Sequence, residues 1–148
     1  MTETFLNPQR TLDELKELRA LTGDDEGAHR VAFTDTWARA NDWYKAKLAE
    51  LPVKVETDEA GNLWATLRGE SDKALIIGGH IDSVPDGGWL DGCLNVLAGL
   101  EVLRRFAAEG TPPITIRVVS WADEEGARFG RSLFGSSAAS GTMNPDDL

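Results

Sequence analysis

The residues best suited to chemistry lie in two short polar segments and in a turn between them. The first segment contains His80 and Asp82, the turn contains Asp91, and the second segment contains the adjacent Glu124 and Glu125. One imidazole and several carboxylates form a ligand set suited to Zn²⁺ or Mn²⁺ if the fold brings them together. Side chains two residues apart in an extended segment point the same way, so the Asp82 carboxylate can accept the far ring N–H of His80. Adjacent glutamates point in different directions, which lets one reach a metal and the other a water bound to it.

Apolar runs beside these segments predict the strand–helix–strand unit that would position them. Ala74–Ile77 is wholly apolar and ends in two glycines, which is typical of a buried central strand. Apolar spacing predicts a helix over Gly92–Glu109 and a second strand over residues 114–119. Such a unit is parallel and right-handed, so both strands end at the same edge of the sheet, where open α/β sheets bind ligands. We therefore expect the polar side chains to converge at that edge.

The rest of the chain predicts helices that flank the sheet and a hairpin that extends it. Thr11 and Glu14 form a capping-box pattern at the start of the first helix, and Thr34 is the expected start of the second. The predicted elements are a helix over Leu12–Leu21, a helix from Thr34 to Pro52, a hairpin of Val53–Thr57 with Leu63–Leu67, and a short helix over Arg131–Ser140. The expected fold class is α/β, with a mixed, largely parallel sheet flanked by helices.

Composition limits the partners that such a chain can have. The 148 residues include 25 acidic and 15 basic side chains, a formal charge of −10, which disfavours a nucleic-acid backbone or an anionic membrane surface. No apolar stretch approaches the ~20 residues of a membrane span, and the N-terminus lacks the pattern of a signal peptide. The single cysteine, Cys93, excludes an internal disulfide and fits a reducing compartment. We expect one acidic, cytoplasmic globular domain with no nucleic-acid or membrane partner.

Three ordered motifs carry a family resemblance. They resemble those of the M20 co-catalytic zinc hydrolases and are His80-Ile-Asp82-Ser-Val-Pro85, Asp91-Gly92 and Asp123-Glu124-Glu125. Longer segments narrow the resemblance to the branch of N-carbamoyl-L-amino-acid hydrolases, β-ureidopropionases and allantoate amidohydrolases: Gly78–Gly88, Val96–Leu103 and Asp123–Gly130. The resemblance implies a zinc-aminopeptidase-like α/β fold and hydrolysis of a C–N bond in a small N-carbamoyl or ureido substrate.

The same resemblance assigns a role to each motif residue. His80 would bind one of two divalent metal ions (Zn or Mn), Asp91 would bridge the two, and Glu125 would bind the other. Glu124 would be the general base that takes a proton from the attacking water, and Asp82 would support His80. The resemblance also implies a cis peptide bond between Asp91 and Gly92, and a homodimer for the complete enzyme.

The sequence also departs from the family pattern. Family members are longer, with a second domain for dimerisation, and each metal takes a further ligand, commonly histidine, from later in the chain. Here His29 and His80 are the only histidines, and Asn95 stands where the family commonly has glycine. We therefore expect residues 1–148 to form the N-terminal part of a catalytic domain, without the later catalytic segment and the dimerisation domain. Partial metal occupancy or none, and little activity, would follow.

Two alternatives remain open, together with ordinary structural roles for single residues. An M20 aminoacylase or peptidase shares the metal motifs, and a non-catalytic metal-binding or structural fragment shares the composition. His29 is expected in a loop with no metal role, and Cys93 is expected as a small buried residue at the start of a helix. Trp89 and Trp121 flank the motifs and are expected to pack in the core.

Overall fold

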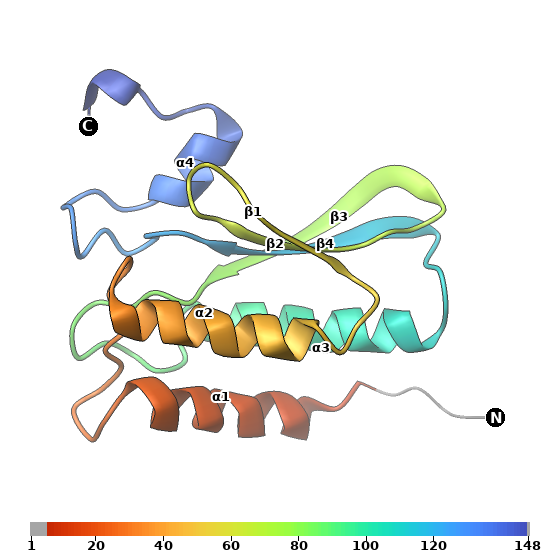
Figure 1. The fold of residues 1–148 in the computed structure, drawn as a ribbon, viewed down its shortest axis with the longest axis horizontal. Coiled ribbons are helices and arrows are strands. Elements are labelled where there is room, and N and C mark those ends of the chain that lie inside the picture. Colours follow the sequence, from red (N-terminus) through yellow and green to blue (C-terminus); the bar gives the residue numbers. More distant parts are fainter. Residues whose placement is uncertain (1–5, 148) are drawn as a thin grey trace.

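The computed structural model describes residues 6–147, which form a mixed four-stranded sheet with helices on both faces (Figure 1). The strands are β1 (Lys54–Thr57), β2 (Leu63–Leu67), β3 (Ser71–His80) and β4 (Ile114–Trp121), in the order β1-β2-β4-β3. The helices are α1 (Pro8–Thr22), α2 (Asp35–Leu48), α3 (Cys93–Ala108) and α4 (Phe134–Ser140), followed by a 3₁₀ turn at Pro145–Asp147. The pair β3/β4 is parallel, whereas β1/β2 and β2/β4 are antiparallel. These elements confirm the expected α/β class with a mixed sheet. The described sheet is not largely parallel as expected, because β1 and β2 join it as an antiparallel hairpin.

The core lies between the sheet and α3. The apolar stripe of α3, which includes Val96, Leu97, Leu100 and Leu103, is fully buried. A Cβ atom on Gly99 would lie 2.8 Å from a methyl group of Val118, so glycine allows α3 to approach β4 closely. Each buried leucine stabilises the fold by about 1.5–3 kcal/mol through loss of water contact. The predicted β3–α3–β4 unit is thus confirmed. In Figure 1, α2 and α3 lie at the same level beneath the sheet, and α1 lies below them, farther from the sheet.

Ion pairs join α1 to α3 and explain why α1 starts earlier than predicted. The N-cap is Asn7, whose side chain accepts from Arg10 N at 3.1 Å, so the expected start at Thr11 is wrong. Glu14 does not complete a capping box because its carboxylate pairs with Arg104 at 2.6 Å across the helix interface. Arg10 and Glu101 form a second pair at 2.8 Å. The predicted start of the second helix is confirmed, with the Thr34 hydroxyl accepting from the backbone of α2.

The strand β3 lies at an edge of the sheet, and β4 lies inside it. The expectation of a buried central strand over Ala74–Ile77 is therefore wrong: Leu75 and Ile76 are 51% and 50% exposed. An apolar run predicts a strand equally well at either place. The position in the sheet is decided by the partners, and β4 pairs with both β2 and β3 while β3 pairs with β4 alone among the described residues.

A buried asparagine connects the β1–β2 hairpin to the segment that follows β4. Within the turn, Asp58 accepts from the backbone N–H of Asn62 at 3.0 Å, and Gly61 supplies the positive φ of +89°. The Asn62 amide, with no exposed surface, donates to Gly135 O at 2.9 Å and accepts from Ala122 N at 2.8 Å. The predicted hairpin is confirmed, and its turn fixes where the loop after β4 begins.

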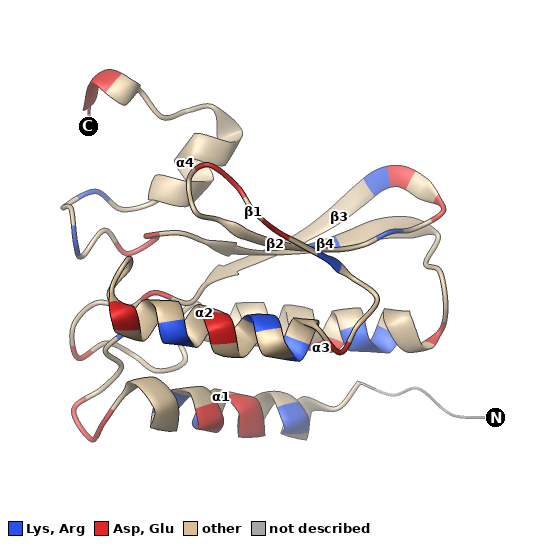
Figure 2. Cartoon of the chain, viewed as in Figure 1, with Lys and Arg blue, Asp and Glu red and all other residues tan. Residues whose placement is uncertain are grey.

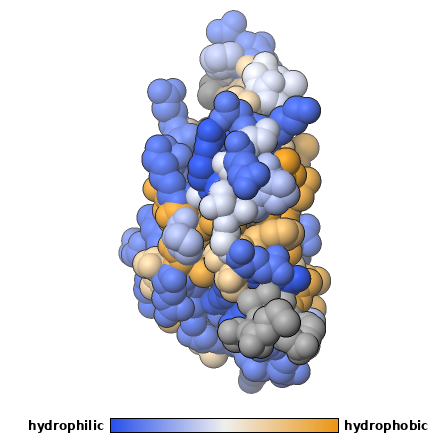
Figure 3. Space-filling view, turned by 90° about the vertical axis from the view of Figure 1, so that its right-hand side faces the viewer, coloured by the Kyte–Doolittle hydropathy of each residue, from blue (hydrophilic) through white to orange (hydrophobic). Residues whose placement is uncertain are grey.

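Surface character is mainly hydrophilic. Figure 3 shows hydrophilic residues over most of the end of the molecule where α3 ends and β3 begins, with hydrophobic residues exposed between them. Figure 2 shows Asp and Glu residues in loops at the opposite end, where β3 and β4 terminate. None of the helices within residues 6–147 is long and apolar enough to cross a membrane.

Candidate metal centre

The candidate ligands come together where β3 and β4 end. The parallel register pairs His80 with Trp121, so the segments that follow both strands leave the sheet at one edge. One side-chain ligand atom each from His80, Asp91 and Glu125 lies within 4.8 Å of the other two. His80 is buried, Glu125 is half-buried and Asp91 is exposed. The convergence expected from the sequence is therefore present in the structure.

The imidazole of His80 is oriented by the backbone of Asp82. Its Nδ1 lies 2.9 Å from the Asp82 carbonyl oxygen and 3.5 Å from the carboxylate Oδ1. The sequence-based expectation made the carboxylate the main acceptor, and the structure corrects this, because the carbonyl is closer. Since Nδ1–H donates to that carbonyl, Nε2 is the nitrogen that can face a metal ion.

The carboxylate of Asp82 links the segment that follows β3 to the segment that follows β4. It is 1% exposed and accepts from the backbone N–H of Glu124 at 3.2 Å and of Glu125 at 3.1 Å. Hydrogen bonds to an ionised acceptor are stronger than neutral ones, so the start of the Glu124–Glu125 segment is held firmly against β3. The Glu124 carboxylate then reaches back to lie 3.3 Å from His80 Nε2.

Gly92 supports the ring of His80 from the other side. It precedes α3 with φ +68°, and a Cβ atom placed on it would lie within 2.5 Å of the Cγ and Cε1 atoms of His80. Among the described residues no peptide bond is cis, so the cis bond expected between Asp91 and Gly92 is not found. The positive φ of Gly92 turns the chain into α3 and leaves room for the imidazole.

Burial and the crowding of acidic groups raise two carboxyl pKa values in the cluster. Burial raises the pKa of Glu125, and a hydrogen bond that the protonated Glu125 donates to Asp91, together with nearby negative charge, raises it further. Burial and the charge of Asp82 likewise raise the pKa of Asp123, whose Oδ1 is buried without a hydrogen-bond partner. Burial lowers the pKa of His80, but its hydrogen bonds to Asp82 and the negative charges around it dominate and raise it to about 9. Such a cluster favours a bound cation.

Three residues expected to be structural behave as such, and one important residue was missed. Cys93 is fully buried as the first residue of α3, and burial raises the pKa of its thiol to about 11. His29 lies in a loop, paired with Asp24 at 2.8 Å. Trp89 packs against the core. Trp121, also expected in the core, is instead half-buried with its ring 5.4 Å from that of Trp64. Arg30, which no motif marked, is fully buried behind the site.

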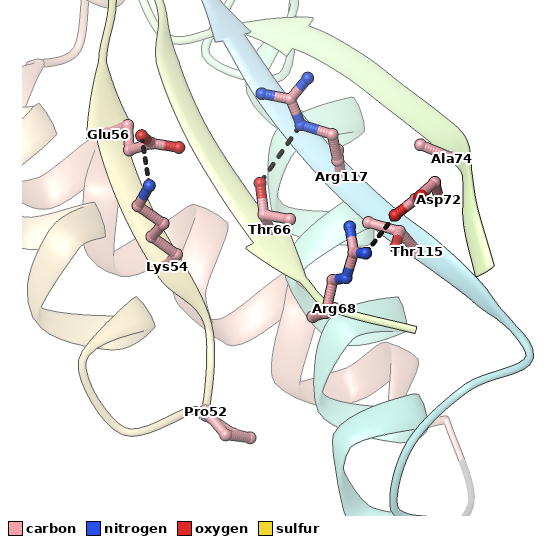
Figure 4. Close-up of a pocket in the computed structure, with 9 residues that line it drawn as sticks. All are labelled: Pro52, Lys54, Glu56, Thr66, Arg68, Asp72, Ala74, Thr115 and Arg117. Carbon is pink, nitrogen blue, oxygen red and sulfur yellow. Dashed lines mark hydrogen bonds and ion pairs between the residues drawn. The ribbon is translucent and has the colours of Figure 1, made fainter. Parts of the chain in front are cut away.

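A hollow elsewhere on the molecule does not carry comparable chemistry. It has a volume of about 610 Å³ and lies on the sheet face opposite α3, near the amino ends of β3 and β4 (Figure 4). Lys54 pairs with Glu56 at 2.8 Å, Arg68 pairs with Asp72, and Arg117 donates to a threonine. Its lining contains no histidine or cysteine, and the metal-ligand cluster lies at the other end of the strands.

Comparison with known proteins agrees with this geometry. An N-carbamoyl-L-amino acid amidohydrolase from Geobacillus stearothermophilus is 40% identical over 127 residues, covering 82% of this chain and 31% of the relative. An allantoate amidohydrolase from Escherichia coli is 34% identical over 125 residues, covering 82% of this chain and 30% of the relative. A crystal structure of a hydantoinase/carbamoylase family amidase from Burkholderia ambifaria matches with a TM-score of 0.91 and 32% identity, covering 97% of this chain and 36% of that one.

The chain therefore spans about a third of the length of these relatives. They confirm the resemblance to carbamoylases and allantoate amidohydrolases that the longer motifs indicated. The family model that matches, over residues 62–146, is described as Peptidase family M28, whereas the short motifs resemble those of M20 hydrolases. That match covers more than half of the sequence and all five candidate site residues. The chain belongs to peptidase family M28.

Proposed function

We propose that this chain supplies the metal-binding edge of an enzyme that hydrolyses a C–N bond in an N-carbamoyl amino acid or ureido substrate. The observation that supports this most directly is the approach of His80, Asp91 and Glu125 to within 4.8 Å, with Glu124 beside them. The names of the relatives give the substrate class.

The donor set fits a divalent metal ion. One imidazole nitrogen and carboxylate oxygens are ligands that Zn²⁺ and Mn²⁺ accept, and the excess of negative charge around His80 favours a cation. A divalent ion bound there would polarise the substrate carbonyl and make water more acidic. We propose His80 as a ligand of one ion, Asp91 as a ligand shared by two ions, and Glu125 as a ligand of the second.

Glu124 is the proposed general base. It stands next to the ligand set but is half-exposed, so its carboxylate can reach a water molecule at the carbonyl carbon of the substrate. In the proposed reaction Glu124 takes a proton from the water as the water attacks, and returns it to the nitrogen that leaves when the C–N bond breaks. Asp82 holds the backbone of Glu124 in place throughout.

Three ligands are too few for two zinc ions, which usually take four each. We propose that further ligands, and the residues that orient the substrate, come from outside these 148 residues, which then form the N-terminal part of a catalytic domain. M20-type use of two metals, a homodimeric enzyme and a cytoplasmic location are further proposals. The buried free thiol of Cys93 supports the last of these.

A peptidase or aminoacylase is the second candidate, because the matching family model is that of a peptidase. Both activities use the same ligands and the same base. They differ in the product: an N-carbamoyl substrate releases ammonia, whereas a dipeptide or an N-acyl amino acid does not.

The experiment compares Glu124→Gln with Glu125→Gln in an enzyme that includes this chain and the relatives' remaining length. Metal content is measured by elemental analysis, and turnover by ammonia release from an N-carbamoyl amino acid. Glu124→Gln should keep its metal while kcat falls about 100-fold or more, because only a positioned base is lost. Glu125→Gln should lose metal and activity together. Metal loss in Glu124→Gln alone would reverse the two roles, and release of amino acids from dipeptides without ammonia formation would favour the peptidase.

A further inference from the structure

A fully buried arginine, Arg30, lies behind the metal-ligand cluster in the loop between α1 and α2. No part of this residue is exposed. Arginine is rarely buried to this extent unless its charge is paired. Among residues 6–147, however, no carboxylate lies within ion-pair distance of its guanidinium. The side chain must therefore be held by neutral acceptors, and their positions indicate its purpose.

Each guanidinium nitrogen contacts a different segment of the chain. Nε donates to the carbonyl oxygen of Ile81 at 2.7 Å, and Ile81 lies between His80 and Asp82. Nη2 donates to Cys93 Sγ at 3.1 Å, two residues after Asp91. Nη1 donates to the Thr22 hydroxyl at 3.2 Å, at the end of α1.

The acceptors are themselves oriented toward the arginine. The Thr22 hydroxyl donates its own proton to Leu18 O at 2.7 Å, which leaves an oxygen lone pair for Arg30. The backbone of Arg30 adds two more contacts: its N–H donates to Ser83 Oγ at 2.9 Å, and its carbonyl accepts from Ser83 N at 2.9 Å. The planar fork of the guanidinium suits such a three-way contact, which a lysine ammonium on a flexible stem would not reproduce.

We propose that Arg30 is a positioning residue of the metal site. It fixes the His80–Asp82 segment relative to the turn that carries Asp91, and its unpaired positive charge lies beside the carboxylate-rich cluster. This inference rests on the proposed function only in treating the cluster as a metal site. No sequence motif marked Arg30, because its acceptors are far from it along the chain.

The test is zinc binding by the 148-residue chain, measured by calorimetry, for Arg30→Met, Arg30→Lys and Cys93→Ala. Arg30→Met should weaken binding about tenfold or more, which is the usual effect of losing a residue that orients ligands. Arg30→Lys keeps one contact, to Ile81, and should restore part of the affinity. Cys93→Ala removes one contact without changing the arginine and should weaken binding less than Arg30→Met.

A second readout does not require any metal. Amide hydrogen exchange at Glu124 and Glu125 reports whether the Asp82 carboxylate still holds their N–H groups. Arg30→Met should speed this exchange beyond what the loss of global stability explains. The matched control is Leu48→Ala, a fully buried truncation at the far end of α2, which should destabilise the fold without local acceleration at these two amides.

The outcomes separate this inference from the proposed function. Zinc affinity and amide exchange in Arg30→Met that match those of Leu48→Ala would overturn the positioning role. If Arg30→Met does not fold, wild-type zinc affinity and exchange in both Arg30→Lys and Cys93→Ala would overturn it instead. If the unmodified chain binds no zinc, the same variants are compared in the enzyme that includes the relatives' remaining length, where absence of zinc would overturn the proposed metal site. The exchange experiment still decides whether Arg30 positions the His80–Asp82 segment.

Discussion

Replacing Gly92 by alanine should weaken metal binding through a steric effect on His80. The new Cβ atom would lie within 2.5 Å of three ring atoms of the imidazole, whereas ordinary contact requires 3.4–4 Å. The ring, or the turn before α3, must therefore move by about 1 Å, and metal–ligand distances tolerate only about 0.2 Å. His80 cannot move freely, because its Nδ1 is hydrogen-bonded to the Asp82 carbonyl oxygen at 2.9 Å and the residue is buried.

The cost to stability can be estimated from two sources. A residue other than glycine at φ +68° costs about 1–3 kcal/mol, and overpacking against a buried ring costs about 1–3 kcal/mol more. Gly92→Ala should therefore reduce the free energy of unfolding by roughly 2–6 kcal/mol, and zinc affinity by about 10- to 100-fold. Urea unfolding and calorimetric zinc titration measure the two effects separately.

Gly141→Ala is the matched control. Gly141 has a similar φ of +72°, but a Cβ atom added to it would meet nothing within 4 Å, and it follows α4 rather than the site. It should lose stability through the backbone term alone and keep its zinc affinity. Unchanged zinc binding in Gly92→Ala, or an equal loss in Gly141→Ala, would refute the steric argument.

Two further predictions concern the metal and the acid stability of the chain. Zinc titration of the 148 residues alone should show weak, substoichiometric binding, because three candidate ligands cannot complete two sites. His80→Ala should weaken this binding further. Two tight zinc sites per chain would contradict the prediction. Burial raises the pKa of Glu101, but hydrogen bonds from Arg10 and the backbone, with the charges of Arg10 and Arg104, outweigh it and lower the pKa. Because the pKa of Glu101 is lower in the folded chain, its carboxylate stabilises the fold at pH values above the unfolded-state pKa of about 4.3. That stability is lost as the pH falls through the lower pKa of the folded state. Glu101→Gln should therefore lower the free energy of unfolding by about 1–3 kcal/mol at pH 7 and by much less in acid. The control Glu50→Gln, at an exposed position, should not show this pH-dependent loss. An equal cost of Glu101→Gln at both pH values would argue against a role for the carboxylate charge.

The convergence of His80, Asp91 and Glu125 could be predicted because few topologies satisfy the sequence pattern. Two apolar strands separated by an amphipathic helix form a right-handed parallel unit, and its two carboxyl ends share one edge. The residues that follow those ends must then meet, whatever the rest of the sheet does. The place of β3 at the edge could not be predicted in the same way, because it depends on which strands pair with it.

The contacts that orient the ligands were harder to predict. The spacing of His80 and Asp82 indicated that they interact, but Asp82 offers both a carbonyl and a carboxylate, and spacing cannot say which one the imidazole uses. Arg30 and Asn62 act on segments 51 and 60 residues away along the chain. A loop arginine or asparagine is usually exposed, so composition gives no reason to single out either one.

Charge balance connects these contacts to the proposed chemistry. Near the ends of β3 and β4, carboxylates outnumber cationic side chains. The cationic side chains are His80, Arg30 and Arg128. The carboxylates are Asp82, Asp91, Asp123, Glu124 and Glu125. Without a bound cation, folding must bring these like charges together at a cost. The pKa of Glu125 is raised first by burial and then also by the neighbouring carboxylates. Hydrogen bonds to Asp82 and the buried charge of Arg30 offset part of that repulsion through contacts that do not use the candidate ligands. The ligand set can therefore be held ready for a divalent ion by residues that never touch it.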